Sequence, residues 1–399
     1  MRVLITHNSY QIRGGEDSVV RDEFELLTRG GVDCRLFSVT NDEIVSVVAK
    51  FKTGFNVVYN FEARRSMRRV IREFRPHVVH VHNFFPLLSP SIFDACRDEG
   101  TPSVMTLHNF RLLCPSALLH PDESLRERSL HRPCWWTIRE RAYRNSMPAT
   151  FALAAMVEFH KRRGTWRSKV DRFVALSPWA LTKFIEGGLP AERMVVKPNA
   201  VARPLMSAPA CRSGALFVGR LDDQKGIPSL LQAWKDLDCP LRVIGDGPLT
   251  NAVREAATIC NITFLGPQPR DVVQREMLAA AFLVLPSRGH EMFPLTVVEA
   301  FAAGLPVLCS DLASLKSLVV PGTTGLTFPS GDPSALAATV RRALANESIL
   351  TELARRASLA YEERYSPDAN FSALLDIYRS SGVSVSSDRC SAAKGPRLH

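Results

Sequence analysis

The sequence predicts an α/β protein built from two parallel sheets, each covered by helices. Short apolar runs alternate with helical patterns in both halves of the chain, which is typical of parallel sheets. A length of 399 residues with 46% apolar content suffices for two domains with their own cores. Residues 201–210 show neither periodicity and contain two prolines, which indicates a linker between the halves.

The elements follow from these patterns in order. In the first half we expect strands over residues 3–6, 34–39, 77–81, 103–107, 173–176 and 194–196, with a first helix over 15–29. In the second half we expect strands over 215–218, 241–244, 262–264, 282–285 and 306–309, then helices over 333–345 and 348–361. Residues 110–170, rich in Arg, His and aromatic side chains, are expected to form an irregular insertion over the interdomain cleft.

These elements predict the domain organisation. We expect a first domain over residues 1–200, a linker over 201–212 and a second domain over 213–365. A last helix should cover residues 366–380, and the Ser-, Gly- and Arg-containing tail over 381–399 should be disordered.

Residues 287–299 place two carboxylates, Glu291 and Glu299, around a loop that leads from a buried strand into a helix beginning at Thr296. A helix N-terminus at the carboxyl end of a parallel strand binds phosphate through free N–H groups and the positive end of the helix dipole. With the two acids, the segment suits a ligand that has phosphates on one side and hydroxyls on the other, such as a nucleotide sugar. Alternatively, Thr296 and Glu299 form a capping box with no role in binding.

A second segment of phosphate-binding type precedes it, over residues 217–226. The predicted strand ends in Gly219, and Arg220 and Lys225 follow before a helix near Ile227. A guanidinium fork and a compact ammonium group together can hold a diphosphate. Solvated surface cations are the alternative, but Gly219 and Gly226 frame these two at a strand end, which favours a binding site.

Histidines and glycines mark the corresponding edge of the first sheet. His108 follows the strand over 103–107, where ligands collect in open α/β sheets. His80 and His82 share one face of the strand over 77–81 and its exit, a pairing that also permits a metal. Gly14 and Gly15 open the first helix and permit close approach of phosphate or sugar, although a plain tight turn explains them nearly as well.

Cysteine usage and apolar patterning indicate a cytoplasmic protein. The nine cysteines are scattered, odd in number and free of any Cys-x-x-Cys, as expected of reduced thiols. Cys114 and Cys134 could share a metal, but no further pair completes such a site. The chain starts directly in a strand pattern rather than a signal peptide, and no apolar run approaches the ~18 residues of a membrane span.

The positive charge is concentrated in the first half. Residues 1–200 hold 30 Lys and Arg against 21 Asp and Glu. Six arginines lie between residues 64 and 75, and Arg64, Arg68 and Arg72 share one helical face. Such a helix can dock on an anionic membrane surface, or it can be an ordinary solvated amphipathic helix. Binding to nucleic acid fits poorly, because no recognisable module accompanies the charge.

Taken together, the motifs resemble the retaining glycosyltransferases of family 4, which have two facing Rossmann-like domains (the GT-B architecture). The matching pieces are RGGE at 13–16, LHNFR at 107–111, the block at 219–226, VIGDGP at 243–248, FLG at 264–266, Glu-x7-Glu at 291–299 and AGLPV at 303–307. The resemblance runs from residue 1 to about residue 380. Two positions depart from the pattern: Pro294 replaces a common Gly, and Ala200 replaces a usual Gly. Because proline has no N–H, the loop donors should come from Phe293, Leu295 and Thr296.

The resemblance implies transfer of a sugar from a nucleotide diphosphate donor to an acceptor with retained anomeric configuration, without metal or cofactor. It implies that Arg220 and Lys225 neutralise the leaving diphosphate and that Glu299 holds the ribose. Glu291 and His108 would contact the sugar. Further implied donor-binding residues are Gly14, Gly15, Gly219, Gly266, Phe293, Leu295 and Thr296.

The resemblance also implies an acceptor side and a fold detail. His80 and His82 would line the acceptor side of the cleft. Independently of the resemblance, the charge surplus of the first half and the arginine-rich helix predict that Arg64, Arg68 and Arg72 face an anionic, lipid-linked acceptor at the inner membrane face. The last helix would cross back to the first domain. A saccharide or a cell-surface polysaccharide precursor is the expected acceptor. Two alternatives remain open at this point: a nucleotide-sugar epimerase on the same architecture, and a non-catalytic nucleotide-sugar-binding protein.

Overall fold

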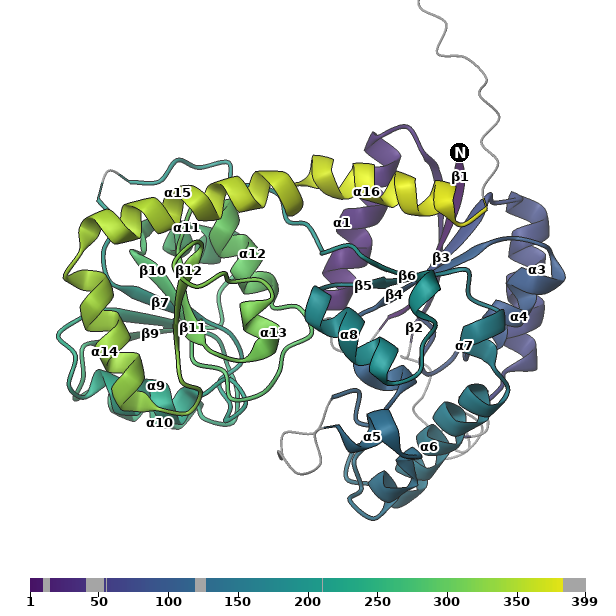
Figure 1. The fold of residues 1–399 in the computed structure, drawn as a ribbon, viewed down its shortest axis with the longest axis horizontal. Helices are drawn as coiled ribbons and strands as arrows, with labels where there is room; N and C mark the ends of the chain where they lie inside the picture. The colour runs from purple at the N-terminus through teal and green to yellow at the C-terminus, as the bar shows by residue number, and fades with distance from the viewer. Residues whose placement is uncertain (10–14, 41–53, 55, 119–126, 210, 383–399) are drawn as a thin grey trace, which may run out of the picture.

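The computed structural model describes residues 1–9, 15–40, 54, 56–118, 127–209 and 211–382. Two α/β units lie side by side, and one long helical arm runs across both of them (Figure 1). Among the described residues, no helix has the length and apolarity needed to span a membrane.

The first unit is built on a six-stranded parallel sheet with the order β2-β1-β3-β4-β5-β6. Its strands are β1 (Arg2–Ser9), β2 (Asp33–Thr40), β3 (Val78–Asn83), β4 (Ser103–Leu107), β5 (Arg172–Ala175) and β6 (Met194–Val196). The principal helices are α1 (Gly15–Arg29), α3 (Phe61–Phe74), α4 (Ser91–Asp98) and α8 (Pro178–Glu186). All six strands predicted from the sequence are present, with ends that differ by a few residues.

The second unit repeats the arrangement, with the strand order β12-β11-β10-β7-β8-β9. Its strands are β7 (Ala215–Val218), β8 (Leu241–Ile244), β9 (Ile262–Gly266), β10 (Phe282–Leu285), β11 (Val307–Ser310) and β12 (Gly325–Phe328). Its helices are α9 (Ile227–Trp234), α10 (Thr250–Ala256), α11 (Arg270–Ala279), α12 (Leu295–Ala302), α13 (Ala313–Lys316), α14 (Pro333–Leu344) and α15 (Glu347–Arg364). The edge strand β12 was not predicted, because four residues that include a glycine give little periodic signal.

Residues 110–170 contain more regular structure than expected. The segment forms η2 (Phe110–Leu112), α5 (Arg128–His131), η3 (Cys134–Ile138), α6 (Met147–Arg162) and α7 (Thr165–Ser168). The expectation of an irregular insertion is therefore wrong over α6, a helix of 16 residues. Its sequence has apolar side chains on several faces, so it lacks the polar side that marks an amphipathic helix. Cys114 and Cys134 are buried free thiols.

The last helix, α16 (Pro367–Ser380), leaves the second unit and packs on the first (Figure 1). Ser366 caps its N-terminus by accepting a hydrogen bond from the N–H of Ala369 at 3.3 Å, and Pro367 fills the first helical position. Leu374 and Tyr378 join the buried apolar cluster that holds Val3 of β1. The crossing of the C-terminal helix to the first unit is thereby confirmed. The expected disordered tail lies, from residue 383 on, outside the described residues.

The two passages of the chain between the units meet at one place. The N–H of Val201, just after β6, donates to the carbonyl of Tyr365 at 3.3 Å. The Tyr361 hydroxyl donates to the carbonyl of Val201 at 2.9 Å. The linker and the α15–α16 junction therefore form a single joint.

Candidate functional site

An ion pair joins the two phosphate-type segments of the second unit. Lys225 Nζ donates to Glu291 Oε2, and Ser287 Oγ donates to Glu291 Oε1 at 2.6 Å. Gly226 makes this approach possible: its φ is 73°, and a Cβ there would overlap the carbonyl oxygen of Pro286. The loop after β7 thus packs tightly on the loop after β10. Lys225 and Glu291, 66 residues apart in sequence, become neighbours.

Asp222 organises the cationic loop. Its Oδ1 accepts the N–H of Lys225 at 2.9 Å, and its Oδ2 lies 3.1 Å from Nε of Arg220. The Arg220 side chain is 68% exposed, so this pair is weak and the guanidinium can reorient toward an anion. The loop, which begins at Gly219, therefore carries one cation engaged with Glu291 and one free to move.

The loop after β10 ends in α12, and its start differs from the expectation. The helix begins at Leu295 with Pro294 at the N-cap, and the cap makes no side-chain hydrogen bond. Thr296 lies inside the helix, so the capping-box alternative is wrong. Glu299 is half-buried, and burial raises the pKa of its carboxyl group while Arg270 lowers it. With no capping role, this carboxyl group is available to a ligand hydroxyl.

The N-termini of α12 and α1 meet between the two units. A Cβ at Gly15, the first residue of α1, would lie 3.3 Å from Cδ1 of Leu295, the first residue of α12. Phe293, in the loop before α12, is half-buried. Two adjacent helix N-termini offer free N–H groups and two positive dipole ends to one anion. Gly14 lies outside the described residues. Gly266 ends the edge strand β9, and its donor-binding role stays a prediction.

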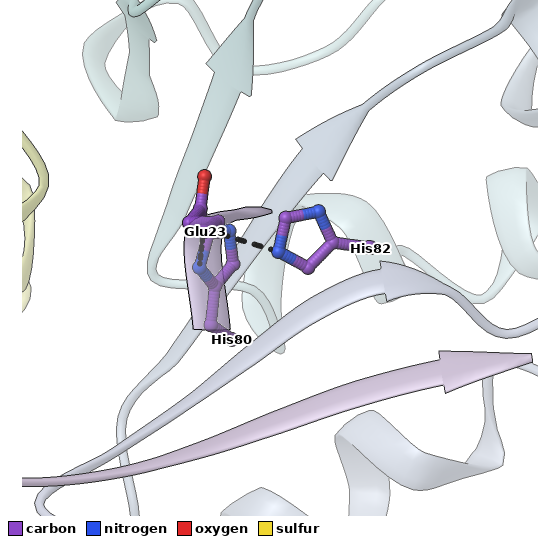
Figure 2. Close-up of side chains that lie close together, drawn as sticks. All are labelled: Glu23, His80 and His82. Atoms are coloured by element: carbon purple, nitrogen blue, oxygen red, sulfur yellow. Dashed lines mark ion pairs between the residues drawn. The ribbon is translucent and has the colours of Figure 1, made fainter. Parts of the chain in front are cut away.

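A chain of imidazoles leads inward from His108. His108 Nε2 lies 3.0 Å from Nδ1 of His82. His80 and His82 in turn flank Glu23 of α1, at 3.1 and 3.2 Å from its Oε1 (Figure 2). The other carboxylate oxygen of Glu23 accepts from Lys197 Nζ at 2.9 Å. One buried network therefore joins β3, α1 and the residue that follows β6.

This network contradicts the expected place of two histidines. His80 is 0% exposed and bonds the Tyr378 hydroxyl of α16 and the Thr106 hydroxyl, each at 2.8 Å. His82 is also buried. Neither side chain lines an acceptor surface, because every residue of the central strand β3 is covered on both faces. His108 keeps part of its surface exposed and can reach a ligand.

The pKa values of the buried groups show how the network balances its charge. Burial lowers the pKa of His82 to about 4, and burial likewise holds the pKa of His108 well below its usual value. Burial alone would raise the pKa of Glu23, but the charge of Lys197 and the imidazoles hold it well below its usual range. The result is one buried ammonium–carboxylate pair beside His82 and His108, whose pKa values burial lowers.

Three of these groups also converge as metal ligands do. One ligand atom each from Glu23, His80 and His82 lies within 4.8 Å of the others. A divalent ion there would sit beside Lys197, which already neutralises the carboxylate, and would leave two buried positive charges uncompensated. We therefore interpret the cluster as a structural network, and the metal-free site stays a prediction.

Comparison with known proteins assigns the family. A model described as glycosyl transferase 4-like domain matches residues 14–200, and one described as glycosyl transferases group 1 matches residues 212–346. The chain belongs to the group 1 glycosyltransferases. The family predicted from the sequence is thus confirmed, and the two matches follow the two sheets.

Individual relatives of this glycosyltransferase are distant. An uncharacterized glycosyltransferase of Methanocaldococcus jannaschii is 31% identical over 39% of this chain, which spans only 45% of that relative's length. Alpha-D-kanosaminyltransferase of Streptomyces kanamyceticus is 24% identical over 80% of this chain and 81% of its own. The Anabaena HepE structure in complex with UDP superposes with a TM-score of 0.66 at 17% identity, covering 95% of this chain and 100% of HepE. That likeness confirms the GT-B fold.

Two acids at the start of α1 lie beside a buried histidine, an arrangement that the sequence did not predict. His7 Nε2 lies 2.9 Å from Asp17 Oδ1, and Nδ1 lies 3.9 Å from Glu16 Oε1. Burial, helped by Asp17 and opposed by Arg111, raises the pKa of Glu16 to about 8. Glu16 is thus largely protonated at neutral pH and does not repel an anion beside Gly15. Glu16 is the last residue of the RGGE motif at 13–16, and this motif was the sequence feature that could have identified it as a site residue.

One contact from the first unit reaches the Glu291 loop directly. The rings of Trp179 in α8 and His290 stack with centroids 4.8 Å apart. Ser177 Oγ donates to the carbonyl of Met292 at 3.5 Å. The loop that carries Glu291 is therefore held from both units of the glycosyltransferase.

The arginines of α3 do not form an open cationic face. Arg64 pairs with Asp98 at 2.6 Å, and Arg68 and Arg72 pair with Glu99 at 2.7 and 2.8 Å. Both acids lie at the end of α4, so two carboxylates offset most of the charge of these three arginines within the protein. In Figure 1, α3 and α4 lie on the side of the first unit that faces away from the second. The expected acceptor-side role of Arg64, Arg68 and Arg72 does not fit this position.

Proposed function

We propose that this protein transfers a glycosyl group from a nucleotide diphosphate sugar to a saccharide acceptor, with retention of the anomeric configuration. The main support is the Lys225–Glu291 pair, which joins the loop after β7 to the loop that leads to the N-terminus of α12. The binding of UDP by HepE, which has the same fold, supports a nucleotide donor.

The Lys225–Glu291 pair gives the donor site a simple order of events. An incoming diphosphate competes for Lys225, because a charge-assisted bond to phosphate replaces the bond to the carboxylate. Glu291 is then released toward the sugar, still oriented by Ser287. Arg220, weakly paired and exposed, turns toward the same phosphates. The two cations neutralise the diphosphate as it leaves, which is the electrostatic term that usually dominates such a reaction.

His108 and Glu299 would hold the two ends of the donor. If His82 directs its Nε2 proton toward Glu23, its Nδ1 accepts the Nε2 proton of His108, which leaves Nδ1 of His108 as a hydrogen-bond acceptor. A neutral imidazole of this tautomer suits a sugar hydroxyl. Glu299 would accept from the ribose hydroxyls, with Gly15 and Leu295 between them at the diphosphate.

The function is tested by incubating the purified protein with a panel of nucleotide sugars, with and without saccharide acceptors. A transferase releases the nucleotide and forms a glycoside, whose anomeric configuration NMR then assigns. Conversion of the donor to its epimer without any acceptor would support the epimerase alternative. Donor binding without turnover across the panel would support a binding protein.

Glu299→Gln is expected to weaken nucleotide affinity by about tenfold, since the amide is a weaker acceptor for ribose hydroxyls than the carboxylate. The melting temperature should change little, because Glu299 makes no capping bond. Isothermal titration with the free nucleotide measures the first quantity, and calorimetry the second. Glu255→Gln, at an exposed position of α10 in the same unit, is a control of equal chemistry. Unchanged nucleotide affinity in Glu299→Gln would remove Glu299 from the donor site.

A further inference from the structure

The inserted segment exposes large apolar side chains on one broad face of α6. Met147, Phe151 and Phe159 are 47%, 55% and 43% exposed. The ring of Trp135 lies beside that of Phe151, with centroids 5.9 Å apart, and widens the apolar area. Clustered apolar side chains of this size in contact with water mark a surface that binds something.

Unpaired positive charge surrounds this apolar face. Residues 127–170 contain ten Lys and Arg against three Asp and Glu, which accounts for most of the surplus in the first half. Within the described part of the chain, no ion pair engages the exposed side chains of Arg139, Arg141, Arg144, Lys161 and Arg162. Arg64, Arg68 and Arg72 of α3 are paired with Asp98 and Glu99, so the larger open cationic surface lies here instead.

A hollow beside α6 combines both characters. Its volume is about 420 Å³, and its walls include the Trp135 and Phe159 rings and the side chains of Arg162 and Arg163. Glu158 also lines it, but its Oε1 accepts the N–H of Cys134 at 2.8 Å. The hollow therefore combines apolar walls with two guanidinium groups, of which that of Arg163 is paired with Asp94 at 3.0 Å.

We propose that α6 and the turn before it, residues 139–162, form a docking surface for an anionic lipid bilayer. The exposed Phe and Met side chains enter the boundary between headgroups and acyl chains, while the arginines and Lys161 face lipid phosphates. The net positive charge of this surface favours an anionic bilayer over a second copy of this chain as its partner, because two such positive surfaces would repel each other.

The position of this surface connects it with the reaction. The inserted segment begins directly after His108, at the carboxyl end of β4. In Figure 1, α5 and α6 form the lower end of the first unit, away from the arm of α15 and α16. Docking through α6 would hold the His108 edge of the sheet near an acceptor carried in the membrane. Bilayer binding itself does not depend on the proposed function.

The test is cosedimentation of the full chain with vesicles of phosphatidylglycerol and phosphatidylcholine, compared with phosphatidylcholine alone. Wild-type protein should bind the anionic vesicles at low salt and dissociate as salt rises. Lys161→Gln/Arg162→Gln should lower the affinity about 30-fold. Phe151→Ser/Phe159→Ser should lower it at least about tenfold. Arg65→Gln/Arg69→Gln, which removes equal charge from exposed positions on α3, should bind like wild type.

Nucleotide binding by every variant provides the internal control, since it should remain unchanged. Three outcomes would overturn the proposal. Wild-type protein could ignore anionic vesicles at low salt. The α3 variant could lose as much affinity as the α6 variant. The protein could be a dimer that Phe151→Ser/Phe159→Ser dissociates, which would assign the face to self-association.

Discussion

Lys225→Ala is expected to lower kcat by at least about a hundredfold, a loss typical of removing one preorganised charge from a transition state. Lys225 would face the diphosphate as its negative charge grows, so its loss should raise the barrier more than it weakens donor binding. The melting temperature should change little, because the pair that Lys225 makes with Glu291 is partly exposed. Steady-state kinetics with the identified donor measures the effect.

Two variants define the limits of this expectation. Lys235→Ala removes an exposed lysine at the end of α9 and should leave kcat unchanged. Arg220→Ala should also lower the rate, since the exposed guanidinium is free to reach the diphosphate. A loss of less than about tenfold in either Lys225→Ala or Arg220→Ala, which corresponds to roughly 1.4 kcal/mol, would exclude that residue from the role.

Lys197→Met is expected to destabilise the first unit by about 3–5 kcal/mol, because it leaves the buried Glu23 carboxylate without a compensating charge. Lys197 is 1% exposed, and its ammonium group is held by Glu23 and by Asn370 of α16 at 3.2 Å. Urea unfolding, followed by the fluorescence of the tryptophans, gives the change in midpoint.

The matched variant is Glu23→Gln/Lys197→Met, which removes both charges. It should recover much of the lost stability, since a neutral amide requires no counter-charge. Lys161→Met, on the exposed side of α6, controls for the loss of a lysine and should change the midpoint little. If the double variant is as unstable as Lys197→Met, packing of the lysine rather than its charge holds this region together.

The sequence predicted those elements whose ends carry local signals. Helix α1 was predicted with its observed bounds, and Gly30 and Gly31 mark its end. Helix α16 was also predicted correctly, because Ser366 and Pro367 form an N-cap and a first turn. Helix α6 was missed because it is apolar on more than one face. The start of α12 was misplaced because Thr296 and Glu299 imitate a capping box, whereas the chain turns at Pro294.

The sequence could not show which partners distant residues have. Lys197 and Glu23 are 174 residues apart, and a buried lysine is indistinguishable in sequence from a solvated one. Arg68 contributed to the pattern of an open basic face because its partner, Glu99, follows the end of another helix, α4. His80 and His82 are two residues apart, so their side chains lie on the same face of β3. Because β3 is a central strand covered on both faces, this spacing does not indicate that the side chains are exposed.

The joint at Val201 and Tyr365 limits how the two halves can move. Both passages of the chain lie on the same side of the molecule and are hydrogen-bonded to each other, so they provide one axis of rotation. Displacement grows with distance from that axis. We therefore expect the Trp179–His290 stack, a contact between the two units away from the joint residues, to change when a ligand draws the units together. The fluorescence of Trp179 would then report the closure of the two units. Glu291, which follows His290 in the same loop, would move together with it.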